Sequence, residues 1–358
     1  MAVKNIAGNA KAKLMMLSYA VEKRGGAAYM LAGEENTGKN YAALQFAKAL
    51  NCRRPADDSD ACDLCENCRA LDRTIGGLDS DGMQATPHPD ISYVNTEKAQ
   101  LSIELMRNAM AAAGSYAPVK LKKRIIIVND AERLNKESSN AILKELEEPR
   151  QDTVIMLIVN APEKMLPTII SRCKKVEIKR ASLAEVEAAV KAAGVFSDAE
   201  AAEAVLFSDG KIGEALDYKR IKENVETAKE AFFSLASGKD DVDGIFRAID
   251  KLSNVKRASK EEGEEAASEG GKRMFLLDIL KILSYIYKDI VLDYLGIKNG
   301  LRQKYGINPD SIKRLSLKQA VRIIKLTEAA QRDLMANANV KILLSALFFN
   351  IRKAGMEN

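Results

Sequence analysis

Four cysteines lie close together in the chain and have the spacing of a metal site. Cys62, Cys65 and Cys68 follow one another at intervals of three residues, and Cys52 precedes Cys62 by ten. Four thiolates in one short segment can complete the tetrahedral shell of structural Zn²⁺, and such a site stabilises local folding by about 10 kcal/mol. The alternatives are a redox pair, an iron–sulfur cluster, whose usual spacings differ, and incidental cysteines. We expect structural zinc, because four thiolates leave no ligand position open for catalysis.

A glycine-rich loop is the second group of residues that could do chemistry. Gly33, Gly38 and Lys39 fit the pattern Gly-x-x-x-x-Gly-Lys, in which backbone N–H groups and the lysine hold phosphate groups. The pattern continues with a Ser or Thr hydroxyl that binds Mg²⁺, and this chain has Asn40 instead. We therefore expect the loop to bind ATP weakly or not at all. The alternative is a structural remnant in which Lys39 only covers a strand-to-helix turn.

Two further reactive side chains stand outside these groups. Cys173 is expected to be a small buried hydrophobic residue, rather than a fifth metal ligand or a nucleophile. His88 is the single histidine of the chain and has no motif that links it to a cysteine. The run His88-Pro89-Asp90 is expected to form a turn that leads into a strand. We therefore assign no catalytic role to either side chain.

The elements that position these residues indicate an α/β fold. An apolar run at residues 28–32 precedes the glycine-rich loop, and a helix is expected over residues 40–50. Other apolar runs lack period-two alternation, as strands covered on both faces do, and lie at residues 91–94, 125–128, 153–159 and 176–178. The segments between them are long enough for helices, and one helix is marked by a cap at Asn135 and a stop at Pro149. Strands that alternate with helices predict a parallel sheet.

The pattern becomes helical after residue 180. Three short helices are expected at residues 182–193, 198–207 and 212–218, and longer ones begin at Phe275, Ser316 and Val340. The predicted organisation is an α/β domain over residues 1–179 with a zinc module at 52–68, a small helical domain over 180–221 and an all-α domain over 222–358. Residues 254–273 carry five basic and five acidic side chains, and we expect a solvated insertion there.

Composition narrows the function classes. The chain has 358 residues, a net charge of +5, no Trp and 5% aromatic residues, so nucleic-acid contact is possible but base-stacking platforms are disfavoured. No apolar run reaches the roughly 18 uncharged residues of a membrane span, and the N-terminus lacks the pattern of a signal peptide. A cytoplasmic protein is expected, which disfavours disulfides as the use of the five cysteines.

The order of the motifs resembles the bacterial clamp-loader branch of the AAA+ family. The resemblance rests on the glycine-rich loop, the four cysteines, His88-Pro89-Asp90, the block Ser-Asn-Ala-Ile-Leu-Lys-Glu-Leu-Glu-Glu-Pro at 139–149, and Ser171-Arg172-Cys173. Residues 210–216 resemble the family's lid motif, and residues 337–340 with the following helix resemble its collar. The resemblance implies a three-domain subunit of a hetero-pentameric ring, in which motor and non-motor subunits place a sliding clamp on primed DNA.

The catalytic positions of the family separate motors from silent subunits. Motors end the third strand with Asp-Glu, where the Asp organises Mg²⁺ and the Glu orients water, and this chain has Asn129 and Asp130. Gly213 stands where motors have a phosphate-sensing Arg, and Asn160 stands where they usually have Thr. The resemblance therefore implies a subunit without useful ATP hydrolysis. The alternative is a divergent motor in which Asn40 and Asp130 support slow turnover.

Arg172, in contrast, is a functional position of the family that this chain retains. The resemblance implies that this arginine reaches into the ATP site of a neighbouring subunit, where such a finger accelerates phosphoryl transfer by roughly 10³ to 10⁵. From the residue by itself, a surface cation is the ordinary interpretation. Other basic residues flank strands and are expected to be solvated rather than to contact DNA: Lys120, Lys122, Lys123, Arg124, Lys174, Lys175, Lys179 and Arg180. A free-standing zinc protein that binds nucleic acid is a further alternative.

Overall fold

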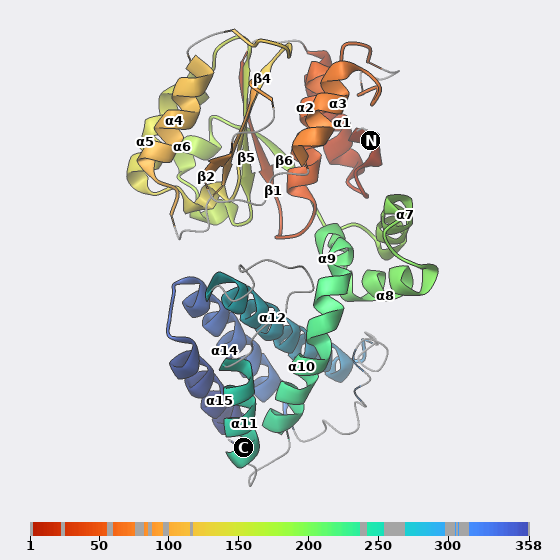
Figure 1. The fold of residues 1–358 in the computed structure, drawn as a ribbon, viewed down its shortest axis with the longest axis vertical. Coiled ribbons are helices and arrows are strands. Elements are labelled where there is room, and N and C mark those ends of the chain that lie inside the picture. The colour runs from red at the N-terminus through yellow and green to blue at the C-terminus, as the bar shows by residue number, and fades with distance from the viewer. Residues whose placement is uncertain are drawn as a thin grey trace. The chain divides into compact units, whose positions relative to one another are not determined.

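The structure is a computed structural model. It describes residues 3–356 apart from 23–25, 56–59, 76–81, 85–87, 96–99, 115–116, 237–241, 254–268, 298–304, 306 and 308–314. Contacts within the chain divide it into two compact units, Met1–Leu216 and Asp217–Asn358, each with buried apolar residues of its own (Figure 1).

A six-stranded sheet forms the centre of the first unit. Its order is β2-β3-β4-β5-β1-β6, and the strands are β1 (Ala27–Ala32), β2 (Gly82–Gln84), β3 (Ile91–Asn95), β4 (Arg124–Val128), β5 (Thr153–Val159) and β6 (Lys174–Glu177). All neighbours are parallel except β2, which pairs antiparallel with β3 at one edge. The predicted parallel sheet is confirmed, with β6 slightly earlier than expected. The sequence did not indicate β2, because three residues without an apolar run carry little signal.

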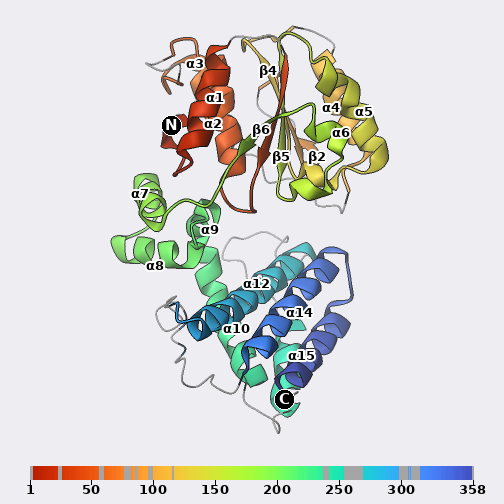
Figure 2. The ribbon, with the colours of Figure 1, turned by 180° about the vertical axis from the view of Figure 1, so that it is seen from behind.

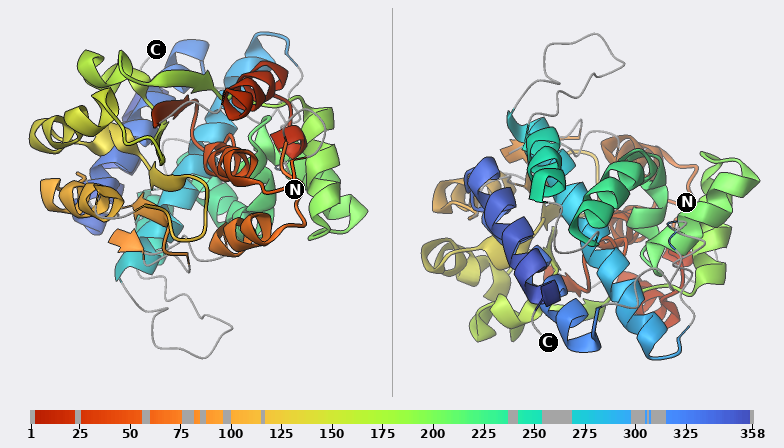
Figure 3. Two further views of the ribbon diagram at one scale, coloured as in Figure 1. Left: turned by 90° about the horizontal axis from the view of Figure 1, so that it is seen from above. Right: turned by 90° about the horizontal axis from the view of Figure 1, so that it is seen from below.

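Helices cover both faces of this sheet. The helices α1 (Ala10–Val21), α2 (Lys39–Asn51) and α3 (Glu66–Ile75) lie on one side, and α4 (Ile103–Gly114), α5 (Lys136–Glu147) and α6 (Pro167–Ile170) lie on the other (Figures 1 and 2). Successive side chains of a strand point to opposite faces. Tyr29 and Leu31 therefore join the core under α2, whereas Met30 joins the core under α5. The three layers are also visible from above (Figure 3).

The predicted helix before Pro149 is confirmed in detail. The side chain of Asn135 accepts a hydrogen bond from the Ser138 N–H and caps α5, and the helix ends at Glu147 with Glu148 as its C-cap. Its buried side chains include Ile142 and Leu146, which belong to the core on that face of the sheet. Single 3₁₀ turns lie at Val3–Asn5, Ala131–Arg133 and Pro162–Lys164.

Three short helices complete the first unit: α7 (Leu183–Ala193), α8 (Asp198–Ser208) and α9 (Ile212–Leu216). Ser182 and Ser197 begin the first two with capping boxes, in which Glu185 and Glu200 bond back to the cap. These helices match the expected segments, although the third ends at Leu216. Because the following helix α10 begins at Tyr218, the boundary expected after residue 221 falls inside it.

The described elements of the second unit are all helices. Its helices are α10 (Tyr218–Ala236), α11 (Val242–Ser253), α12 (Glu269–Tyr294), α14 (Leu317–Met335) and α15 (Val340–Met356). Phe232, Tyr287 and Phe348 are among its largest buried side chains. Of the expected insertion at 254–273, residues 254–268 lie outside the described residues, and Glu269–Arg273 begin α12. Among the described helices, none is both long enough and apolar enough to cross a membrane.

Candidate functional site

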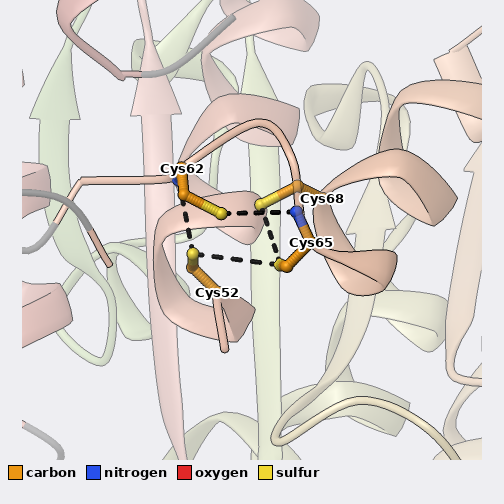
Figure 4. A group of neighbouring side chains, drawn as sticks. All are labelled: Cys52, Cys62, Cys65 and Cys68. Atoms are coloured by element: carbon orange, nitrogen blue, oxygen red, sulfur yellow. Dashed lines mark hydrogen bonds between the residues drawn. The ribbon is translucent and has the colours of Figure 1, made fainter. Parts of the chain in front are cut away.

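The four predicted metal ligands come together in the structure. Cys52 follows the end of α2, Cys62 and Cys65 lie in the loop after it, and Cys68 is in the first turn of α3. Their sulfur atoms all lie within 4.8 Å of one another, and the side chains point toward a common centre (Figure 4). A tetrahedral shell with Zn–S bonds of about 2.3 Å places sulfurs about 3.8 Å apart. The geometry therefore fits a zinc ion.

Zinc binds cysteine as the thiolate. Burial raises the pKa of all four thiols, and hydrogen bonds outweigh this effect at Cys62 and Cys65, whereas the pKa values of Cys52 and Cys68 stay raised. The Cys62 N–H donates to Cys52 Sγ at 3.3 Å, and the Cys65 N–H donates to Cys62 Sγ at 3.4 Å. Burial raises the pKa of Cys65, but backbone N–H groups and the thiols of Cys68 and Cys62 outweigh it and lower this pKa to about 6. A thiolate is therefore accessible near neutral pH at one position of the cluster.

Charged side chains fix the cysteine loop to the rest of the unit. Lys48 of α2 is 0% exposed at its side chain and forms ion pairs with Asp63 and, at 2.8 Å, with Asp72 of α3. Asp60 accepts hydrogen bonds from the N–H groups of Val3 and Lys4 at 2.9 and 3.0 Å. Sequence reasoning missed these contacts, because a lysine on a helix is expected to be solvated until its partners are known.

The glycine-rich loop follows β1, as predicted, and requires its two glycines. A Cβ atom on Gly33 would lie 1.9 Å from the carbonyl oxygen of Ile178. Gly38 has a φ of 88°, in the left-handed region that favours glycine, and a Cβ there would lie 2.8 Å from a methyl carbon of Ile212. The close approach of neighbouring backbone and of α9 therefore explains both residues.

Lys39 is turned onto the loop itself. It is 5% exposed, and its Nζ donates to the carbonyl oxygen of Glu34. Burial lowers the pKa of Lys39 to about 8, although nearby carboxylates, with Glu132 the strongest, partly oppose this shift. The ammonium group that would hold a phosphate is thus engaged by the backbone of its own loop.

Neutral side chains bond to one another beside the glycine-rich loop. Asn40 Nδ2 donates to Asn129 Oδ1 at 3.1 Å, and the Tyr93 hydroxyl donates to Asn40 Oδ1 at 3.2 Å. Asn129 Nδ2 donates in turn to Asn95 Oδ1 at 3.2 Å. Magnesium in proteins is usually held through carboxylates. These four side chains carry no charge and bond to one another, so they are poor ligands for the ion.

Asp130 is held by neighbours in the first unit. Asn160, which follows β5, donates to Asp130 Oδ1 at 2.7 Å and to Glu132 Oε1 at 2.9 Å. Arg133 pairs with the other oxygen of Asp130 at 3.0 Å. The structure thus brings Asp130 and Asn160 together, as their positions after adjacent parallel strands require. Glu132 was not predicted and completes this group.

The short helix α9 lies directly on the glycine-rich loop. The Gly213 N–H donates to the carbonyl oxygen of Asn36 at 2.9 Å, and a Cβ on Gly213 would lie 3.0 Å from that oxygen. Arg180 joins the same region, because its guanidinium donates to Glu34 of the loop at 2.6 to 3.1 Å and also to Asp209. We call the ion pairs of Arg180 with Glu34 and Asp209 the Arg180 bridge. It was not foreseen, since Arg180 was expected to be solvated.

Arg172 lies apart from the metal ligands and the loop in the fold, after the short helix α6. Its side chain is 31% exposed. Nε donates to Glu147 Oε1 at 2.6 Å, and Nη1 donates to the carbonyl oxygen of Thr168 at 2.7 Å. The predicted site residues therefore form three separate groups: the cysteine cluster, the loop with its strand-end partners, and Arg172.

The remaining candidates have structural contacts. Cys173 is partly buried against the core, and burial raises its pKa to about 12, so the thiolate needed for a nucleophile is disfavoured. His88 is 5% exposed, and its Nδ1 accepts the Asp90 N–H at 3.2 Å. The buried Asp90 carboxylate accepts the N–H groups of Val119, Lys120 and Leu121. These contacts fix the turn before β3 and the loop before β4.

One expectation about the basic residues is wrong. Arg124 was expected to be solvated, but it is 5% exposed, and its Nη2 lies 3.9 Å from Asp90 Oδ1. Its position at the start of a central strand explains the burial, because β4 is covered on both faces. Lys122 also has a protein partner, since it donates to the carbonyl oxygen of Cys52.

Comparisons with known proteins agree with the motif pattern. A sequence model described as "DNA polymerase III, delta subunit" matches residues 8–182. The chain is 34% identical over 148 residues to DNA polymerase III subunit delta' of Pseudomonas aeruginosa, covering 41% of each chain. It is 32% identical over 165 residues to subunit delta' of Bacillus subtilis, covering 45% of each. The matches thus span less than half the length of these curated relatives.

More distant matches extend the comparison. The chain is 27% identical over 161 residues to DNA polymerase III subunit tau of Escherichia coli, covering 44% of this chain and 22% of that one. A gamma subunit-related protein from Thermotoga maritima has a similar structure, with a TM-score of 0.51, 18% identity, and coverage of 96% of this chain and 99% of that chain. At this identity the likeness shows the fold.

Proposed function

We propose that the chain is a delta-prime-type subunit of the clamp loader, a proposal supported by the match of residues 8–182 to the model described as "DNA polymerase III, delta subunit". It would be a component of the DNA polymerase III holoenzyme. In this role it assembles with motor subunits of the gamma/tau type and a delta subunit in a hetero-pentamer that loads the sliding clamp on primed DNA. The chain acts there as a stator with little or no ATP hydrolysis of its own.

One observation carries the stator proposal: the chain's own neutral side chains fill its metal position. Asn40 and Asn129 bond to each other where a motor has a hydroxyl and a carboxylate. A magnesium ion entering there would have to break this bond and would gain no negative ligand in return. Lys39 would also have to leave the Glu34 carbonyl oxygen before it could bind a phosphate. These costs favour a subunit that does not turn over ATP.

The proposed contribution of the chain to catalysis is Arg172. Its guanidinium lies on the partly exposed surface after α6, and its position in the Ser-Arg-Cys motif supports a trans-acting arginine finger. A guanidinium placed on the γ-phosphate of a neighbouring motor stabilises the charge that develops during transfer. The chain would thus provide a group to a site that it does not itself contain.

We assign a structural Zn²⁺ to Cys52, Cys62, Cys65 and Cys68. The close sulfurs and the N–H donors support it. When bound, the ion cross-links the end of α2 to the start of α3 and performs no chemistry on a substrate.

ATP turnover tests the stator proposal. The purified chain should hydrolyse ATP no faster than its Lys39→Ala variant, with or without primed DNA. Lys39-dependent turnover by the chain alone would contradict the proposal. It would favour the second candidate, a divergent gamma/tau-type motor with slow ATPase activity, which the match to subunit tau and the retained Lys39 and Asp130 support.

The finger is tested in the complex reconstituted with gamma/tau-type and delta subunits. Arg172→Ala should leave assembly intact and slow DNA-stimulated ATP turnover, by up to roughly 10³-fold at the site that Arg172 completes. The exposed cation Lys175 is the matched control, and Lys175→Ala should turn over ATP at the unmodified rate. An unchanged rate for Arg172→Ala would remove the finger assignment.

A further inference from the structure

The guanidinium of Arg172 is held through all three of its nitrogen atoms. Nε and Nη2 contact one carboxylate oxygen of Glu147, and Nη1 donates to the carbonyl oxygen of Thr168. Each terminal nitrogen of an arginine carries a second N–H group. The contacts therefore set the plane of the guanidinium and leave it with donors beyond those that the protein uses.

Packing fixes the end of α5 that carries Glu147. Glu147 is the last residue of α5, directly before the C-cap residue Glu148 and the helix stop at Pro149. The preceding Leu146 is 3% exposed, in the same core cluster as Ile169 of α6, the helix that carries Thr168. Both groups that hold the guanidinium thus come from elements anchored in one core.

We propose that Glu147 is a positioning residue for Arg172, an inference that rests on the proposed trans-acting role of this arginine. The arginine side chain is long and has several rotatable bonds, so it loses much rotamer freedom when its guanidinium is fixed on a phosphate. The contact with Glu147 removes much of this freedom before a neighbouring subunit is met. The ion pair itself contributes little to the stability of the fold, because the Arg172 and Glu147 side chains are 31% and 47% exposed.

If only charge mattered, removing the Glu147 carboxylate would speed ATP turnover rather than slow it. A carboxylate beside the guanidinium competes with a phosphate for the same donors, so its removal would speed the reaction if the contact only stored the arginine in an inactive position. Orientation dominates here for a geometric reason: both contacts with Glu147 go to a single oxygen, and each terminal nitrogen keeps an N–H for the phosphate. Glu147 can therefore hold the guanidinium while the guanidinium binds a second anion.

The test measures DNA-stimulated ATP turnover in the reconstituted complex for Glu147→Ala, Glu147→Gln and their combinations with Arg172→Ala. Glu147→Ala should lower kcat by about tenfold with little change in KM, because misorientation affects the transition state. Glu147→Gln keeps one oxygen acceptor and should lose less. In the Arg172→Ala background, neither substitution should lower kcat further. The exposed neighbour provides a control, and Glu148→Ala should keep the unmodified rate.

The outcomes separate this inference from the function on which it rests. If Arg172→Ala itself leaves the rate unchanged, the finger assignment is wrong and the role of Glu147 is lost with it. If Arg172→Ala slows turnover but both Glu147 variants are unimpaired or faster, only the positioning role is overturned. A loss at Glu147 that persists without Arg172 also overturns it. If Glu147→Ala unfolds, which its melting temperature would reveal, Glu147→Gln gives the answer.

Discussion

Single buried polar residues decide much of the local structure, and His88 shows how. Its ring lies under the turn before β3, 5% exposed, and Nδ1 accepts the Asp90 N–H. A nitrogen that accepts must be unprotonated, so the contact requires the neutral ring. Burial lowers the pKa of His88, although Asp90 partly opposes this shift. The single histidine of the chain is therefore a structural group that is sensitive to acid.

We expect the pH dependence of unfolding to report this histidine. With a folded pKa below the ordinary 6.5, the unfolded chain takes up the proton more readily. The stabilisation is therefore complete above pH 6.5 and declines as the pH falls from 6.5 toward the folded pKa. His88→Asn keeps an acceptor without this titration. Urea unfolding of the zinc-loaded protein between about pH 7 and pH 5.5 should thus show a smaller stability loss in the variant. Equal losses would contradict the assignment.

At the scale of elements, the short helix α9 packs directly against the glycine-rich loop. Gly213 brings the α9 backbone to within hydrogen-bonding distance of Asn36, and Ile212 lies against Gly38. The Arg180 bridge joins Glu34 of the loop to Asp209 at the end of α8. These contacts hold α9 against the loop.

The Arg180 bridge should limit opening of this contact. Because its three side chains are 36% to 71% exposed, Arg180→Ala should lower the free energy of unfolding by only about 0.5–1 kcal/mol. Hydrogen exchange at the Gly213 amide should become several-fold faster, since local opening no longer breaks the bridge. Lys179→Ala is the neighbouring control, because Lys179 is a nearby cation that pairs with Glu177 at 3.5 Å and takes no part in the Arg180 bridge. Equal exchange rates in the two variants would show that the bridge does not hold α9.

For the whole molecule, the two units have separate cores and different means of stabilisation. The first combines a covered sheet with a cysteine cluster, whereas the second depends on packed helices and on a buried carboxylate, Asp278. Asp278 accepts hydrogen bonds from Arg220 at 2.7 Å and from Asn224 at 3.1 Å. Zinc should therefore stabilise one unit and leave the other unaffected.

Metal removal tests this division in the full chain. Metal analysis should find about one zinc ion per chain, and Cys65→Ser should lose it, because three thiolates no longer close the tetrahedral shell. Calorimetry should show the melting of the first unit shifted by several degrees or more after chelation or in Cys65→Ser, with the second unit's transition unchanged. Cys173→Ser, outside the cluster, serves as the control for thiol loss. A folded, metal-free chain with unshifted melting would contradict the zinc assignment.

The sequence by itself determined the elements and the chemical identity of the candidate groups. Apolar runs indicated the parallel strands, Asn135 and Pro149 bounded α5, and the cysteine spacing predicted the cluster, because these signals are local in the chain. Tertiary structure decided which partner each polar group has. Arg172 meets Glu147, Lys39 turns to Glu34, and the buried Lys48 pairs with Asp63 and Asp72. Most of these pairs join separate elements, and hydrogen bonds act over about 3 Å, so only the packing of strands and helices could bring them together.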